Sequence, residues 1–102
     1  MKRLVFIITI FFTFISVAEN TEGFNSYVKK NYKKAKEHFQ KDFNSSGMDP
    51  LYSYNLGVTS QTLGQKGDAV FYYLQTLQRA PELSEAKNNL NLLVKDLSLI
   101  HI

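Results

Sequence analysis

The sequence contains no cysteine and only two histidines. Without cysteine, the chain can form no disulfide, no thiolate metal site and no cysteine-linked lipid anchor. His38 and His101 are far apart, and neither stands in a metal-ligand spacing such as two histidines four residues apart on a helix. No serine lies in a nucleophile-elbow setting, and no two carboxylates form an evident acid–base pair. These absences predict a protein that is not an enzyme and has no catalytic residue, metal site or cofactor.

Long hydrophobic runs are absent except at the N-terminus. Two basic residues there precede an apolar run over residues 4–15, and a stretch of small residues ends at Ala18. This order is typical of a secretory signal peptide. The run is shorter than the ~20 residues that a membrane-spanning helix needs, which favours cleavage after Ala18 over an uncleaved anchor. We therefore predict a signal peptide over residues 1–18 and a single domain over residues 19–102.

The net charge of +3 depends on that N-terminal segment. Cleavage after Ala18 removes Lys2 and Arg3 and leaves ten basic against nine acidic residues. The basic composition of the whole chain is therefore no argument for binding nucleic acid, and we expect none. A domain this short buries only ~60% of its unfolded surface, so we expect it to depend on a partner.

The sequence does contain a 34-residue period that fits a helical hairpin. With Pro50 as position 1, positions 7, 8, 20, 24 and 32 are Leu56, Gly57, Ala69, Tyr73 and Pro81. The small residues at positions 8 and 20 let two antiparallel helices approach closely, and the large residues fill the space around that contact. Asp49 is a good N-cap before Pro50, and Pro81 stops the second helix. We predict helices over residues 50–63 and 68–80, within a complete repeat over residues 50–83.

Parts of the same period lie before and after the complete repeat. Residues 19–49 form a partial repeat, in which positions 8, 17, 20 and 24 are Gly23, Tyr32, Ala35 and Phe39. We expect a break at Asn31 and a helix over about residues 32–43. Gly47 is able to take the left-handed conformation that ends this helix.

A last helix, capped by Ser84, is predicted over residues 84–102. Its main apolar stripe consists of Ala86, Leu90, Leu93, Leu97 and Ile100. Leu92, Leu99 and Ile102 lie off this stripe, whereas a capping helix normally turns a polar face outward. Either another helix packs on this face or the protein self-associates through it.

The first helix of each hairpin is expected to line a concave face. Tyr54 and Asn55 offer an aromatic surface and an amide that can both donate to and accept from a peptide backbone. The partner-binding residues that we predict on this face are Leu51, Tyr54, Asn55, Val58, Asn88, Asn89 and Leu92. The alternative is that Tyr54 and Val58 only pack on the neighbouring helix.

Lysines form the one strong charge feature. They are concentrated around the predicted helix over residues 32–43, as Lys29, Lys30, Lys33, Lys34, Lys36 and Lys41, and Glu37 is the sole acid between the first and the last of them. The simplest interpretation is a solvated face opposite the apolar stripe. The cluster could instead meet an anionic membrane surface, an acidic partner or nucleic acid, of which the predicted export makes nucleic acid a weak choice. The first of these gives an alternative function, a membrane-surface protein held by an uncleaved N-terminal helix and this lysine-rich helix.

Three phrases of the sequence resemble tetratricopeptide repeat (TPR) proteins, namely Tyr54-Asn55-Leu56-Gly57, Gly67-Asp68-Ala69-Val70-Phe71-Tyr72-Tyr73 and Ala80-Pro81. Together with Asn89-Leu90, they are similar to the repeat segment of exported Bat-type (aerotolerance-operon) proteins. The resemblance covers about residues 24–97. It implies a periplasmic or cell-envelope protein that assembles with other components and has no catalytic residues of its own.

Some residues depart from the TPR pattern. Glu85 and Asn89 stand where chaperone-type repeats that grip a terminal carboxylate carry cations, which argues against a carboxylate clamp. Ser60 and Thr76 replace larger aromatic and small apolar residues, which predicts looser packing. We predict an all-α fold, a short TPR-type α-solenoid of antiparallel hairpins with about four to five helices. The predicted function is an exported adaptor or scaffold that binds another protein or peptide in the concave groove.

Overall fold

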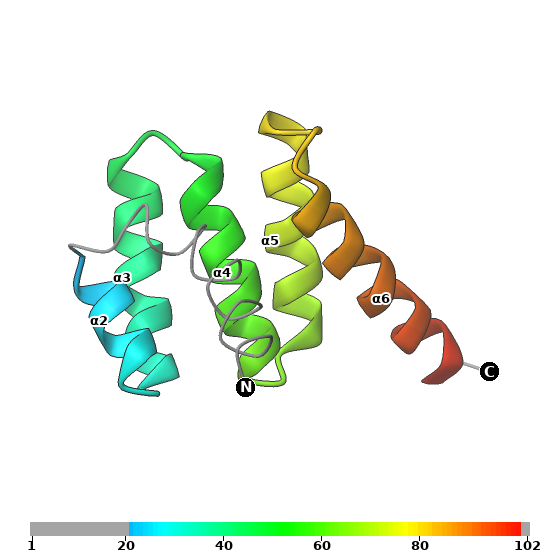
Figure 1. The fold of residues 1–102 in the computed structure, drawn as a ribbon, viewed down its shortest axis with the longest axis horizontal. Coiled ribbons are helices and arrows are strands. Elements are labelled where there is room, and N and C mark those ends of the chain that lie inside the picture. Colours follow the sequence, from blue (N-terminus) through cyan, green and yellow to red (C-terminus); the bar gives the residue numbers. More distant parts are fainter. Residues whose placement is uncertain (1–20, 101–102) are drawn as a thin grey trace, which may run out of the picture.

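The computed structural model describes the backbone of residues 21–100 and the side chains of residues 21–97. The predicted signal peptide over residues 1–18 lies outside this part of the chain. The described chain forms α2 (Glu22–Val28), α3 (Tyr32–Ser45), α4 (Pro50–Thr62), α5 (Lys66–Arg79) and α6 (Ser84–Ile100), with no strand among these residues. Each helix packs against the next along the chain, and α6 leans away from the row (Figure 1). The predicted all-α class is confirmed for this region.

The start of α4 follows from its first residues. The Asp49 carboxylate accepts a hydrogen bond from the Leu51 backbone N–H at 2.9 Å, and Pro50 occupies the first turn. The backbone N–H groups of a first helical turn have no partner within the helix, so Pro, which lacks this group, is tolerated there. An Asp N-cap followed by Pro therefore begins the helix, as predicted. Gly47 before it has φ +72°, the expected left-handed conformation, and Met48 shares it with φ +68°.

Helix boundaries differ from the prediction at several ends. The α5 helix begins at Lys66, two residues before the predicted start, so Gly67 lies in its first turn instead of in a loop. A Cβ atom on Gly67 would meet no other atom within 4 Å, so packing does not require glycine there. The α3 helix continues beyond Phe43 to Ser45, where the Ser46 hydroxyl donates to the Phe43 carbonyl at 3.0 Å. Helix ends fray, so boundaries are defined only to within one or two residues and differences of this size are expected.

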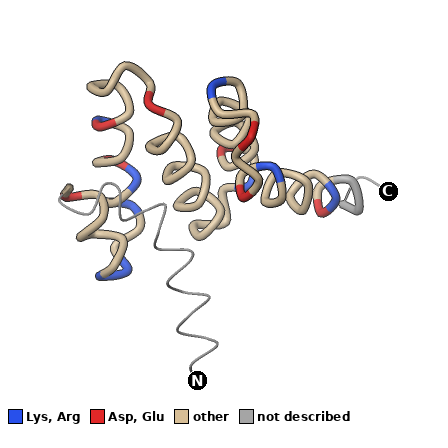
Figure 2. The backbone as a smooth tube through the Cα atoms, turned by 45° about the horizontal axis from the view of Figure 1, so that its top comes forward, with Lys and Arg blue, Asp and Glu red and all other residues tan. Residues whose placement is uncertain are grey.

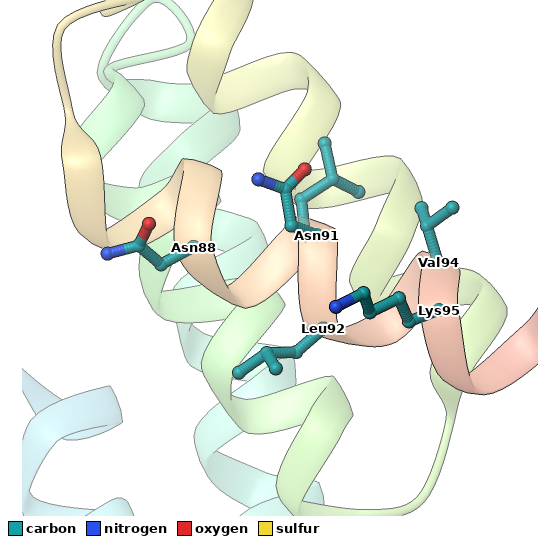
Figure 3. Close-up of a pocket in the computed structure, with 6 residues that line it drawn as sticks. Asn88, Asn91, Leu92, Val94 and Lys95 are labelled. Atoms are coloured by element: carbon teal, nitrogen blue, oxygen red, sulfur yellow. The ribbon is translucent and has the colours of Figure 1, made fainter.

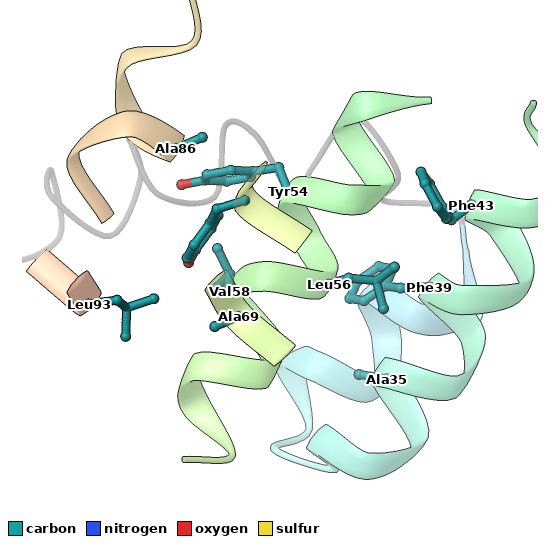
Figure 4. Packing of buried hydrophobic residues seen from close by; sticks show 10 residues of the cluster. Ala35, Phe39, Phe43, Tyr54, Leu56, Val58, Ala69, Ala86 and Leu93 are labelled. Carbon is teal, nitrogen blue, oxygen red and sulfur yellow. The ribbon is translucent and has the colours of Figure 1, made fainter. Parts of the chain in front are cut away.

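The core is built from one contact that occurs twice. A Cβ atom on Gly57 would lie 2.5 Å from Cε1 of Tyr73, and one on Gly23 would lie 2.7 Å from Cδ1 of Phe39. Only glycine permits so close an approach of backbone to ring. Ala35 and Ala69, which are also 34 residues apart, are both fully buried. Figure 4 shows how Phe39 and Leu56 join the two hairpins into one core.

Polar contacts also tie the hairpins together. The Lys36 ammonium forms an ion pair with Asp68 at 2.7 Å, which links α3 to α5. Lys66 forms a second ion pair with Asp96 and so links α5 to α6. The Ser53 and Thr76 hydroxyls lie 2.7 Å apart within the α4–α5 contact. Both hydroxyls are buried, so Thr76, one of the two residues predicted to loosen this hairpin, is hydrogen-bonded there. The other, Ser60, is buried with its hydroxyl unpaired among the described residues.

The last helix buries part of its predicted stripe. Ala86 and Leu93 are buried, and Leu90 packs against the core while remaining half-exposed. Ser84, predicted as a cap, is the first helical residue, and its hydroxyl donates to the Glu85 carboxylate at 3.3 Å. Leu92 is 63% exposed, as expected for a residue off the stripe. The other two off-stripe residues, Leu99 and Ile102, lie outside the described side chains.

Within residues 21–100, no helix combines the length and the apolar content that crossing a membrane requires.

Candidate functional site: the face between helices α4 and α6

The middle of α4 is enclosed on every side, whereas Gln61 and Thr62 at its end are exposed. All residues from 53 to 60 are buried, and Tyr54, Asn55 and Val58 are only 1%, 0% and 3% exposed. These predicted partner-binding residues therefore lie inside the protein in this structure. The sequence indicates this burial, because none of the 13 residues of α4 is charged. A helix without a polar, charged stripe is typically buried all round.

Tyr54 packs on neighbouring helices, the alternative considered from the sequence. Its ring centroid lies 6.0 Å from that of Tyr73 on α5, and the ring extends toward Ala86 on α6 (Figure 4). Burial, and secondly the charge of Glu85, raise the pKa of Tyr54 to about 12, although a hydrogen bond with Asn89 opposes the shift. The phenol is therefore neutral at physiological pH and can donate a hydrogen bond.

A polar pocket of about 250 Å³ opens beside Tyr54, between α4 and α6. It is lined by Val58, Gln61, Thr62, Tyr73 and Asn89. The Asn89 amide donates to the Tyr73 hydroxyl at 3.3 Å, and that hydroxyl donates to the Gln61 side-chain carbonyl at 2.8 Å. Two predicted partner-binding residues, Val58 and Asn89, are thus brought together. The lining is polar but uncharged, which suits hydrogen bonding to amide groups better than binding an ion.

Tyr73 was expected only as a core aromatic residue, yet its hydroxyl connects Gln61 with Asn89 across the pocket. Burial raises its pKa, so it remains a neutral hydrogen-bond donor. The sequence held a signal for this role. One period earlier, Phe39 packs against Gly23 in the same way but has no hydroxyl. The hydroxyl of Tyr73 is therefore not needed for this packing.

Asn55 is unusual among the buried side chains. It is fully buried, and neither its amide nitrogen nor its amide oxygen has a hydrogen-bond partner in the part of the chain that the structure describes. Leaving a buried amide unpaired costs about 1–3 kcal/mol. Helical geometry places Asn55 on the same side of α4 as Leu51, Val58 and Thr62, which is the side that faces the pocket. A partner that reaches this amide needs the enclosed face of α4 to open.

The remaining predicted residues lie elsewhere. Asn88 and Leu92 line a wider hollow of about 670 Å³ on α6, together with Leu90, Asn91, Val94 and Lys95. Asn88 and Leu92 point to one side of the helix and Val94 to the other (Figure 3). Leu51 is half-buried beside the Asp49 cap. The seven predicted residues therefore do not form one continuous open groove. Self-association through the exposed face of α6 stays a prediction.

Within residues 21–97, no group of three or more His, Cys, Asp or Glu side chains is close enough together to hold a metal ion. Comparison with protein-family models, with curated proteins and with solved structures found no match.

Proposed function

We propose that this chain is an exported TPR-type adaptor of the cell envelope that binds a peptide segment of another protein against the α4–α6 face. The observation that carries the proposal is the Asn55 amide, which is buried on that face with neither atom paired in the described chain. A primary amide can accept from a backbone N–H and donate to a backbone carbonyl at once. A bound peptide would therefore remove the cost of the unpaired amide.

Two further observations support this proposal. The Gly–aromatic contact recurs after 34 residues, the period of TPR hairpins, in which successive first helices line a concave surface. The Gln61–Tyr73–Asn89 hydrogen-bond chain adds uncharged donors and acceptors beside Val58. A site of this kind recognises peptide backbone and small polar side chains, while an anionic peptide terminus would meet Glu85 rather than a cation.

Affinity capture from the native cell envelope tests the proposal. The tagged full chain is expressed in its own cells, so that any N-terminal processing takes place, beside Asn55→Ala and an Asn91→Ala control on the exposed side of α6. We expect a specific protein to be retained by the wild type and by the control, and to be lost with Asn55→Ala while the thermal unfolding midpoint stays unchanged. Equal retention by all three chains would overturn the proposed site.

A further inference from the structure

The lysines at the α2–α3 turn form an exposed charge cluster that the fold does not use. Lys29 and Lys30 make the turn, Lys33 and Lys34 lie in the first turn of α3, and all four side chains are exposed. We call these four residues the lysine turn. Figure 2 shows the blue positions gathered at this end of the α2–α3 hairpin and along α3. Lys36, by contrast, is held by Asp68 and Gln65 and serves the packing of α3 on α5.

Among the described residues, no carboxylate forms an ion pair with the lysine turn. In residues 21–97, ion pairs are formed by Lys36 and Lys66 but by none of these four lysines. The first turn of α3 contains no acidic residue, and Asn31 before it makes no side-chain capping bond. Cations near the start of a helix oppose its dipole, and Lys30 adopts φ +65°, which side chains larger than hydrogen disfavour. The contacts of the described residues therefore do not use the charges of these four lysines.

An apolar side chain stands beside the charges. Val28, the last residue of α2, is 51% exposed immediately before Lys29. An exposed apolar group flanked by lysines matches the boundary of a bilayer, where the charges meet lipid headgroups and the apolar group reaches the acyl region. The single residue Val28 makes a small contribution, so most of the attraction would be electrostatic.

The composition of the lysine turn distinguishes between anionic partners. Arginine forms the two-pronged contacts that specify phosphates and bases, and in residues 21–100 the one arginine is Arg79, on α5 rather than at this turn. The nearest aromatic rings, Tyr27 and Tyr32, are half-buried and pack edge-on against each other with centroids 5.1 Å apart. Their mutual packing and partial burial reduce the ring surface on which a base could stack. Point charges without directional partners suit the diffuse field of a lipid surface.

We propose that the lysine turn, with Val28, docks this domain on the surface of an anionic phospholipid membrane. This proposal is independent of the α4–α6 face, which could fail its own test without affecting it. Docking would hold the α2–α3 end of the array against the membrane. The attraction would weaken as salt rises, because exposed charges are screened over about 8–10 Å at physiological ionic strength.

Vesicle co-sedimentation of the full chain tests the proposal. The probes are phosphatidylcholine vesicles with and without phosphatidylserine. The apolar run at residues 4–15 contributes to binding on both kinds of vesicle. The readout is therefore the ratio of the partition coefficient with phosphatidylserine to that without it. The test variant carries glutamine at all four positions of the lysine turn. The control loses the same charge at exposed sites elsewhere, Lys41→Gln, Arg79→Gln, Lys87→Gln and Lys95→Gln.

We expect the test variant to lower the ratio at least about tenfold, since each lysine near an anionic surface changes partitioning about fivefold. The control should keep a ratio within about threefold of the wild type, because its charges lie farther from the docked end. An equal loss in both variants would show a general effect of net charge and overturn the proposal. Binding to single-stranded DNA is measured for the same proteins. If the test variant loses DNA binding more strongly than vesicle binding, the proposal is overturned in favour of a nucleic-acid site.

Discussion

Gly57 lies so close to the ring of Tyr73 that a Cβ atom on it would be 2.5 Å from Cε1. The same relationship joins Gly23 to Phe39, one 34-residue period earlier, at 2.7 Å from Cδ1. Carbon atoms do not approach so closely without displacement, so each glycine sets how near two helices of the array can lie. The paired contact is the physical basis of the repeat, and it makes these glycines the positions least tolerant of a side chain.

Replacing Gly57 by alanine should destabilise the protein. Alanine favours a helix by about 1 kcal/mol over glycine, but overpacking a buried contact costs about 1–3 kcal/mol or more. Because the opposing atoms belong to a fully buried ring, we expect a net loss of about 1–2 kcal/mol in the free energy of unfolding, measured by urea denaturation. Gly67→Ala is the matched control. A Cβ atom there would have open space, so this variant should gain about 0.5–1 kcal/mol. Equal effects of the two substitutions would contradict the role of Gly57.

The buried hydroxyl pair of Ser53 and Thr76 should show strong coupling. Removing either hydroxyl alone leaves its partner with one hydrogen bond fewer, at a cost of about 0.5–1.5 kcal/mol. Each hydroxyl also donates to a backbone carbonyl, Ser53 to that of Pro50 at 3.0 Å and Thr76 to that of Tyr72 at 2.8 Å, so neither single substitution leaves the other hydroxyl without a partner. The double variant should lose clearly less stability than the two single losses combined. Additive losses in this double-mutant cycle would show that the hydroxyls do not interact.

Alkaline pH should destabilise the fold through its buried tyrosines. The folded-state pKa of Tyr54 is raised from 10.0 to about 12, and that of Tyr73 is also raised. The unfolded chain therefore loses these protons first, and stability falls with rising pH. For Tyr54 the stabilising difference is complete below pH about 10 and is lost between about 10 and 12, by up to about 1.4 kcal/mol per pH unit, and Tyr73 acts in the same direction.

Denaturant unfolding at several pH values, with tyrosinate absorbance as a second signal, measures this loss. Tyr54→Phe removes one ionising group and should make the alkaline decline shallower. An identical pH dependence of the wild type and Tyr54→Phe would mean that Tyr54 ionises in the folded state as readily as in the unfolded chain.

The lysine turn should reduce stability as it stands. Lys33 and Lys34 lie in the first turn of α3, where a positive charge opposes the helix dipole by about 0.3–1 kcal/mol. Lys33→Gln/Lys34→Gln should therefore raise the unfolding free energy by a few tenths of a kcal/mol to about 1 kcal/mol. The gain should shrink in high salt, which screens exposed charges. A loss of stability would show instead that the fold depends on these lysines.

The fold was predictable where spacing determines contact. The Gly57–Tyr73 and Gly23–Phe39 pairs, the buried alanines at positions 35 and 69 and the Asp49 cap all follow from residue type at a given interval. The first turn of α5 was missed because Gly67 was treated as a loop residue, whereas the local geometry accepts any small residue there. Spacing identifies which residues share a helix face, but it carries less information about the ends of helices.

The candidate site was only partly predictable. Spacing placed Val58 and Asn89 on facing helices, and the structure joins them in one pocket. Burial of Tyr54 and Asn55 depends on everything that packs around α4, and helical periodicity reports only one face at a time. The absence of charge over residues 50–62 was the better signal for this burial. The hydrogen bonds of Tyr73 require three side chains from three helices to meet, which a period of 34 residues does not specify.

The unfolding free energy of Asn55→Leu is the measurement that tests most directly whether the α4 face is kept for a partner. Leucine has a similar shape and no polar atoms, so it removes a buried amide that has no partner in the described chain. If Asn55 serves binding, the variant should be as stable as the wild type or up to about 1 kcal/mol more stable in urea denaturation. A loss of about 1–3 kcal/mol would show that the amide is hydrogen-bonded within the folded protein, and would contradict a binding role for Asn55.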